Sequence, residues 1–131
     1  MIVVDASTIV AALVDAGVAG DEARDRIARA RQRHAPQLVY VETANALRRL
    51  TSSALVTDDL ASVAVGQLER LDVTAYPHAP FLRRVWELRK NLTAYDAIYI
   101  AVAEAVGAPL VTLDKRLASA PGIRCEVEVM L

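Results

Sequence analysis

Carboxylate side chains follow the two clearest predicted strands of this chain. Asp5 comes directly after the β-branched run at residues 2–4, and Asp114 follows the apolar run at residues 110–113. Such runs are typical of buried parallel strands. In open α/β sheets, ligands bind beyond the carboxyl ends of the strands, near the point where the strand order reverses. Both acids are therefore expected at that edge of a sheet.

Two further acids are expected in the first turns of helices. Glu42 begins a predicted helix over 39–50 and follows a weak strand near Leu38, which fits the same sheet edge. Asp96 lies in the first turn of a mostly apolar helix that starts at Thr93 and is expected to be buried on most sides. Because this helix follows another helix, periodicity alone does not place Asp96 at the edge.

A convergence of these carboxylates would require compensation of their charges. Two like charges 4 Å apart repel by about 1 kcal/mol in water and by about 4 kcal/mol at an effective dielectric constant of 20. Helix N-termini, worth about 0.3–1 kcal/mol each, do not offset this repulsion. Either some acids are protonated or a cation binds among them. An all-oxygen ligand set favours Mg²⁺ or Mn²⁺ over zinc, and such cations commonly act on phosphates.

Each acid taken alone also has a purely structural interpretation. Asp5 and Asp114 are possible helix N-caps, Thr93 and Asp96 form a possible capping box, and Glu42 is a possible solvated helix residue. These interpretations leave the shared strand-edge location unexplained. The remaining metal-binding residue types, His34, His78 and Cys125, have no metal-ligand spacing.

The composition indicates one domain, 1–131, with a substantial core. Of its 131 residues 54% are hydrophobic, and the net charge of −1 neither favours nor excludes nucleic acid. All but Lys90 and Lys115 of the 15 cations are arginine, which suits phosphate contacts but also follows from codon bias. The single Cys125 excludes an intrachain disulfide, and we find no signal peptide or membrane-spanning run. We expect a cytoplasmic protein.

Strands separated by helices predict a small doubly wound α/β domain with a parallel sheet and helices on both faces. Helices are expected over 6–14, 21–33, 39–50, 58–71 and 81–90 and from residue 93. Strands are expected over 2–4, 73–76, 110–113 and 125–129, and a weak strand or a loop over 34–38. The helix over 58–71 is expected to bury Leu60, Val63, Leu68 and Leu71. Gly107 stands where a helix C-cap is expected.

Four sequence blocks surround the acids: residues 4–7 (Val-Asp-Ala-Ser), 42–47 (Glu-Thr-Ala-Asn-Ala-Leu), 92–97 (Leu-Thr-Ala-Tyr-Asp-Ala) and 113–114 (Leu-Asp). They resemble those of PIN-domain ribonucleases, and most closely the VapC toxins of type II toxin–antitoxin modules. The resemblance covers the whole chain in order. It implies a three-layer α/β/α domain with a central, mainly parallel sheet.

The resemblance also implies an active site and a reaction. Asp5, Glu42, Asp96 and Asp114 would be the catalytic acids, with Asp5, Asp96 and Asp114 as ligands of Mg²⁺ or Mn²⁺. Metal-activated water would cleave tRNA or rRNA, leaving a 5′-phosphate and a 3′-hydroxyl, and so inhibit translation and growth. Glu42 would complete the site. Ser7, Asn45 and Thr112 are candidates to hydrogen-bond the carboxylates, or else ordinary caps and surface polar residues.

The implied partners are a VapB-type antitoxin and the RNA substrate. In the resembled family the antitoxin lies across a toxin groove and often directs a basic residue at the acids. The toxin is usually a homodimer, and the antitoxin alone supplies DNA binding. We expect no membrane association.

Some basic and aromatic residues are candidates for RNA contact. The cations that flank the predicted site in sequence are Arg83, Arg84, Arg89, Lys90, Lys115 and Arg116. Tyr95 and Trp86 could stack on unpaired bases. Against this, Trp86, Tyr40 and Tyr99 stand among apolar residues at helical spacing, which is more typical of core or interface positions.

Other function classes fit the sequence less well. A haloacid dehalogenase-type phosphohydrolase needs a second Asp two residues after the first, where this chain has Ser7. A receiver domain needs paired acids early in the chain, and a Rossmann nucleotide site needs a glycine-rich first turn, which residues 5–9 lack. A catalytically silent PIN-like module that binds RNA or antitoxin stays open as the alternative.

Overall fold

The computed structural model describes residues 1–130 and contains one five-stranded sheet in which all neighbouring strands are parallel. The strands are β1 (Ile2–Val4), β2 (Arg33–Pro36), β3 (Thr74–Tyr76), β4 (Leu110–Thr112) and β5 (Val127–Val129). Their order is β3-β2-β1-β4-β5, so the direction of strand addition reverses between β1 and β4. Asp5 and Asp114 follow these two strands, at the carboxyl edge of the sheet.

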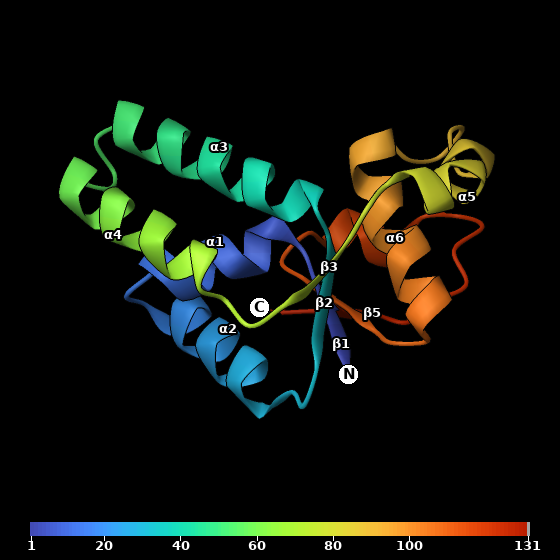
Figure 1. Cartoon of the computed structure of the whole chain (residues 1–131), viewed down its shortest axis with the longest axis horizontal. Helices are drawn as coiled ribbons and strands as arrows, with labels where there is room; N and C mark the ends of the chain where they lie inside the picture. Colours follow the sequence, from blue (N-terminus) through green and yellow to red (C-terminus); the bar gives the residue numbers. More distant parts are fainter. Residues whose placement is uncertain (131) are drawn as a thin grey trace.

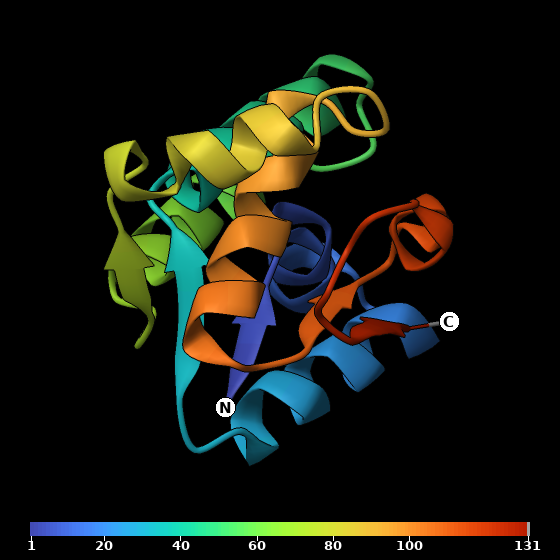
Figure 2. The same cartoon turned by 90° about the vertical axis from the view of Figure 1, so that its right-hand side faces the viewer.

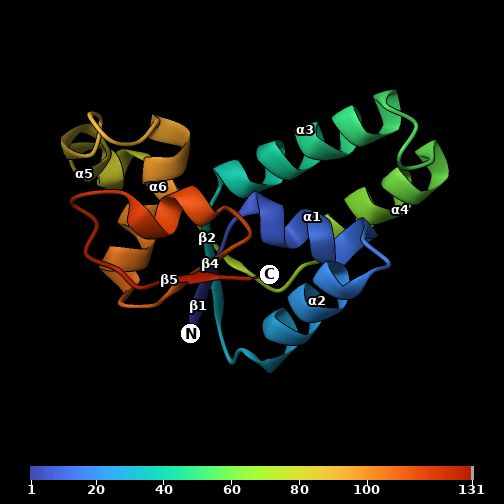
Figure 3. The ribbon, with the colours of Figure 1, turned by 180° about the vertical axis from the view of Figure 1, so that it is seen from behind.

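Helices cover both faces of the sheet, as the sequence predicts. They are α1 (Ala6–Val14), α2 (Val18–Arg29), α3 (Leu38–Ser52), α4 (Asp58–Glu69), α5 (Leu82–Glu87) and α6 (Ala94–Val106), with 3₁₀ turns η1 (Ala79–Phe81) and η2 (Lys115–Ser119). Helices α1 to α4 lie on one side of the sheet, and α5 and α6 lie on the other (Figures 1 and 3). The three-layer α/β/α architecture is confirmed.

Helix α6 is the most deeply buried helix and packs against β1, β2 and β4. Its residues 97–103 are all buried, which confirms the prediction from its apolar sequence. Thr93 caps its first turn by accepting a hydrogen bond from the Asp96 amide at 3.2 Å. Gly107 ends it with φ of 70°, a left-handed conformation that favours glycine. Within residues 1–130 no helix is long and apolar enough to cross a membrane.

Three predicted elements differ from the structure. Helix α2 spans Val18–Arg29 rather than 21–33, because residues 33–36 pair with β1 as strand β2. The helix expected over 81–90 is reduced to α5, preceded by the turn η1. The expected buried side of α4 is half wrong. Leu60 and Val63 are 43% and 58% exposed, and Ala61 and Ala64 face inward in their place. Leu68 is buried and Leu71 packs against the core, as predicted. The small alanines let α4 lie close to α1 and α3.

Candidate active site

Asp5 is both a buried acid and the N-cap of α1. Its Oδ1 accepts hydrogen bonds from the Ser7 hydroxyl at 2.7 Å, the Thr8 amide at 3.1 Å and the Thr8 hydroxyl at 3.2 Å. Its Oδ2 accepts one from the Thr112 hydroxyl. The residue is only 7% exposed, and burial raises the pKa of its carboxyl although these hydrogen bonds oppose the rise. Uncharged donors therefore fix the orientation of this carboxylate.

The same hydroxyl groups connect Asp5 to the end of β4. Thr112 Oγ1 accepts a hydrogen bond from the Asp114 amide at 3.0 Å, and Ser7 Oγ accepts one from the Leu113 amide at 3.1 Å. The contacts predicted between carboxylates and Ser7 and Thr112 are thus present. Asn45 instead accepts a bond from Arg48 at 2.9 Å.

Sequence reasoning missed Thr8. The sequence feature that could have identified Thr8 is its position three residues after the N-cap Asp5, where a threonine can bond the capping acid. The Thr8 hydroxyl has a single proton, which lies within reach of both Asp5 Oδ1 at 3.2 Å and the Val111 carbonyl at 3.0 Å, so it links α1 to β4.

Glu42 approaches the edge from α3 and is held by a tyrosine of α6. The Tyr99 hydroxyl donates to Glu42 Oε1 at 2.5 Å. Burial raises the pKa of Glu42, the Tyr99 bond opposes this, and the negative charges of Asp96 and Asp5 raise it further. Glu42 is therefore within electrostatic range of two other predicted acids. Sequence reasoning placed Tyr99 among core residues, and its need to bond its buried hydroxyl was the missed signal.

Asp96 and Asp114 share a guanidinium group. Arg116 donates to Asp114 from Nε at 3.1 Å and from Nη2 at 2.6 Å, and the Nη2 atom lies 3.9 Å from Asp96 Oδ2. Hydrogen bonds from Arg116 lower the pKa of the Asp114 carboxyl. Asp114 also caps η2, since its Oδ1 accepts from the Arg116 amide at 3.0 Å. One cation can therefore contact both carboxylates at once.

The predicted acids thus come from four separate elements and face one region. Asp5 follows β1, Glu42 lies in α3, Asp96 lies in the first turn of α6, and Asp114 follows β4. Within the described part of the chain, no three acid, histidine or cysteine side chains stand close enough together to form a ready metal cage. The site is a set of oxygen donors at the sheet edge with Arg116 as its cation.

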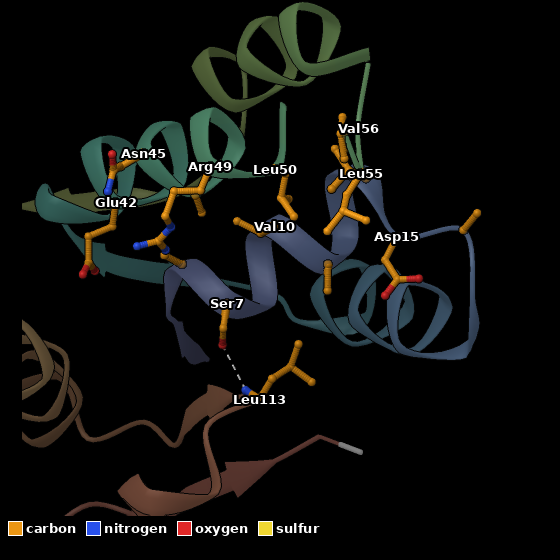
Figure 4. Close-up of a pocket in the computed structure, with 15 residues that line it drawn as sticks. Ser7, Val10, Asp15, Glu42, Asn45, Arg49, Leu50, Leu55, Val56 and Leu113 are labelled. Atoms are coloured by element: carbon orange, nitrogen blue, oxygen red, sulfur yellow. Dashed lines mark hydrogen bonds between the residues drawn. The ribbon is translucent and has the colours of Figure 1, made fainter. Parts of the chain in front are cut away.

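An apolar groove of about 660 Å³ lies between α1 and α3 and reaches one of these acids, Glu42 (Figure 4). Its apolar walls are formed by Val10, Val14, Ala46, Leu50, Leu55 and Val56. Glu42 and Asn45 lie toward one end and Asp15 toward the other in Figure 4. At the acid end, Ser7 and Leu113 complete the lining. The groove therefore joins an apolar channel to Glu42 at the edge of the sheet.

The candidate RNA-contacting residues divide into two groups. Arg84 is committed to the fold, because its guanidinium binds Glu104 at 2.6 Å and 3.1 Å and the Gly122 carbonyl at 2.7 Å. Trp86 and Tyr95 are largely exposed, as stacking on bases would require, and Tyr99 is buried. The Arg89 guanidinium lies 4.6 Å from the centroid of the Trp86 ring.

Known proteins share the sequence pattern and the fold of this chain. Residues 2–123 match the PIN domain family. The chain is 43% identical over 130 residues to ribonuclease VapC9 of Mycobacterium tuberculosis H37Rv, covering 99% of this chain and 98% of the relative. It is 39% identical over 129 residues to ribonuclease VapC1 of the same organism, covering 98% and 96%.

Two solved structures share the fold at low sequence identity. One is M. tuberculosis VapC20, a sarcin-ricin loop cleaving toxin, with a TM-score of 0.72, 20% identity and coverage of 95% of this chain and 97% of that chain. The other is VapBC2 from Rickettsia felis, bound to a DNA fragment from their promoter, with a TM-score of 0.67, 18% identity and coverage of 96% and 98%.

Proposed function

This chain is a PIN-domain ribonuclease of the VapC family, the toxin half of a type II toxin–antitoxin module, and we propose that it cleaves structured RNA by a metal-dependent reaction. The substrate would be a tRNA or an rRNA, and its cleavage would inhibit translation and growth. The observation that carries the proposal is the arrival of acids from four elements at the point where strand order reverses.

The donor chemistry fits Mg²⁺ or Mn²⁺. Asp5, Asp96 and Asp114 would be the ligands, directly or through water, since Mg²⁺ usually keeps several waters and uses few carboxylates. Arg116 supports this fit, because its Nη2 atom already lies between the oxygens of Asp114 and Asp96. When bound, the cation would lower the pKa of a coordinated water and stabilise the charge on the phosphate.

The protein residues would position the reaction. Asp5 is held by Ser7, Thr8 and Thr112, so its oxygens keep one orientation. Tyr99 bonds Oε1 of Glu42, and the other oxygen would accept a hydrogen bond from the water that attacks phosphorus in line. The products would be a 5′-phosphate and a 3′-hydroxyl.

The apolar groove would receive the C-terminal segment of a VapB-type antitoxin. Its walls suit apolar side chains, and its end at Glu42 would let a basic residue of that segment meet the acids. Fold similarity to the toxin–antitoxin complex from R. felis supports this partner. We also propose a homodimer within the complex, DNA contact through the antitoxin only, and action in the cytoplasm.

The test is cleavage of total RNA by antitoxin-free protein, with Mg²⁺ or Mn²⁺ compared with EDTA, alongside Asp96→Asn. We expect discrete, metal-dependent products from the native protein and none from the variant. Cleavage that survives both EDTA and Asp96→Asn would exclude this mechanism. A folded protein that binds metal but cuts no RNA would support the alternative, a silent module that binds RNA or antitoxin.

A further inference from the structure

A second hollow, of about 570 Å³, opens beside the acids from a different direction. One wall is the α5–α6 connection at residues 89–93, and the other is the segment at 116–121 that includes most of η2. The Asn91 side-chain amide donates to the Pro121 carbonyl at 3.3 Å, which holds the walls side by side. Figure 2 shows the two segments facing each other across this side of the molecule. We call this hollow the polar cleft.

The polar cleft is lined by cations and hydrogen-bonding groups. Its charged residues are Arg89, Lys90 and Arg116 against the single acid Asp96, and Asn91, Thr93 and Ser119 add polar side chains. Lys90 and Arg89 are exposed, and Arg116 has 79% of its side chain exposed. The cleft therefore offers positive charge to solvent, in contrast to the apolar groove.

Arg116 and Asp96 connect the cleft to the predicted catalytic centre. Both residues line the cleft, and Arg116 also binds Asp114 at 2.6 Å. A ligand in the cleft thus lies directly beside the carboxylates. Arg89 is held in place, because its Nη1 atom donates to the Trp86 carbonyl at 2.9 Å while its guanidinium covers the Trp86 ring. Such a fixed guanidinium suits a phosphate group.

We propose that the polar cleft binds the RNA backbone phosphates next to the cleaved bond, an inference that rests on the proposed ribonuclease function. Arg89, Lys90 and Arg116 contact the phosphates, and Asn91, Thr93 and Ser119 supply hydrogen bonds to phosphate or ribose oxygens. The substrate and the antitoxin segment then approach the same acids through different openings. The cleft accounts for part of the sequence-predicted RNA contacts and leaves Arg84 out of them.

The experiment is fluorescence anisotropy with a fluorescein-labelled 12-nucleotide oligouridylate, in EDTA so that no metal-dependent cleavage occurs. The test variant is Arg89→Ala with Lys90→Ala. Its matched control is Arg31→Ala with Arg70→Ala, which removes two exposed arginines that precede β2 and β3, at the opposite edge of the sheet. We expect roughly tenfold weaker binding for the test variant and less than twofold change for the control. A plot of the logarithm of the binding constant against the logarithm of the salt concentration should become less steep, by about 0.7 for each phosphate that is no longer neutralised.

A gain-of-charge variant makes the test independent of loss of folding. Ser119→Arg adds a cation to the cleft wall and should strengthen binding by about threefold, with a steeper salt dependence. Circular dichroism of every variant checks that the fold is retained.

The outcomes separate the cleft from the proposed function. If the native protein cleaves RNA with Mg²⁺ or Mn²⁺ but the Arg89/Lys90 variant binds oligouridylate with native affinity, the cleft assignment is wrong and the function stands. If binding depends on the cleft but no metal yields cleavage, the cleft stands and the ribonuclease proposal fails. Native protein that binds no oligouridylate in EDTA excludes the cleft, because its cations need no metal.

Discussion

The apolar groove and the polar cleft reach different members of the same set of acids, Glu42 and Asp96 respectively, and are built from different kinds of structure. The groove lies between α1 and α3. Val10 of α1 and Ala46 and Leu50 of α3 line it. The cleft lies between a helix connection and a 3₁₀ segment, where backbone and long polar side chains are exposed. The two helices thus form an apolar surface that suits the proposed antitoxin segment, and the irregular segments form a polar surface that suits phosphates. The difference suggests that inhibitor and substrate use separate routes to one centre.

The largest effect is expected at Glu42, the predicted catalytic acid that lines the groove. Glu42→Gln keeps the size of the side chain and the oxygen that Tyr99 can bond, but it removes the negative charge and the proton acceptor. Cleavage should slow by roughly 10²–10⁴-fold. Oligouridylate anisotropy should show that the cleft still binds RNA. Cleavage rates within threefold of native protein would exclude Glu42 from the reaction.

A bulky charged side chain in the groove should weaken antitoxin binding and leave RNA binding unchanged. Ala46→Arg fills the channel between α1 and α3, so binding of the cognate antitoxin should weaken by at least about 30-fold, or 2 kcal/mol. Ala44→Arg is the matched control, because Ala44 is exposed on the same helix outside the groove. Calorimetry measures antitoxin binding and anisotropy measures RNA binding. Equal losses of RNA and antitoxin binding would show that the two openings act as one.

A nearly buried ion pair adjoins the cleft, because Arg84 also binds the carbonyl of Gly122, which follows the cleft residue Pro121. The side chains of Arg84 and Glu104 are 18% and 12% exposed, and Glu104 also accepts the Arg124 amide at 2.7 Å. Glu104→Gln should lower the free energy of unfolding by about 2 kcal/mol, less than for a fully buried pair because solvent still reaches Arg84. Urea unfolding measures the loss. RNA affinity should fall more than antitoxin affinity.

The same ion pair sets a pH dependence. Burial raises the pKa of Glu104, but hydrogen bonds from Arg84 and the Arg124 amide outweigh burial and lower it below the ordinary 4.5. A depressed folded-state pKa gives stability that is complete above the unfolded-state value and is lost as the pH falls through the folded-state value. Native protein should therefore lose stability below about pH 4.5, and Glu104→Gln should lose less. Parallel pH profiles for the two proteins would contradict this assignment.

The smallest effect concerns the tyrosine that orients Glu42. Tyr99→Phe removes the 2.5 Å hydrogen bond and leaves the ring in the core. Cleavage should slow by about tenfold, the low end for a residue that positions a catalytic group. Single-turnover cleavage measures the change. A loss as large as that of Glu42→Gln would mean that Tyr99 does more than position the acid.

The sequence predicted best where one physical rule decides the outcome. Asp5 and Asp114 follow apolar strands, and parallel strands bring their carboxyl ends to one edge, so these positions followed from local pattern. Asp96 could not be placed in this way, because α6 follows α5 rather than a strand. Its position depends on how the buried α6 packs across β1, β2 and β4. The resemblance of the four blocks, rather than periodicity, supplied that residue.

Other features depend on contacts between distant segments and were not predictable from pattern. The buried side of α4 was assigned to Leu60, Val63, Leu68 and Leu71. Leu68 and Leu71 pack inward, but Ala61 and Ala64 take the place of Leu60 and Val63, where α4 contacts α1 and α3. Arg116 was predicted as a possible RNA contact, and its bonds to Asp114 and Asp96 emerged only from the folded chain. The metal ligands and catalytic roles stay predictions.

The double use of Asp5 constrains which mutations can disarm the toxin during evolution. A substitution there removes a predicted catalytic acid and also the cap of α1, worth about 1 kcal/mol, with the bonds that tie α1 to β4. Asp96 accepts no capping bond for its own helix, since Thr93 performs that task. Inactive descendants that still fold and still bind antitoxin should therefore arise more often by changes at Asp96 than at Asp5. Lineages that lose the enzymatic activity would keep Asp5, because it still caps α1 and ties it to β4.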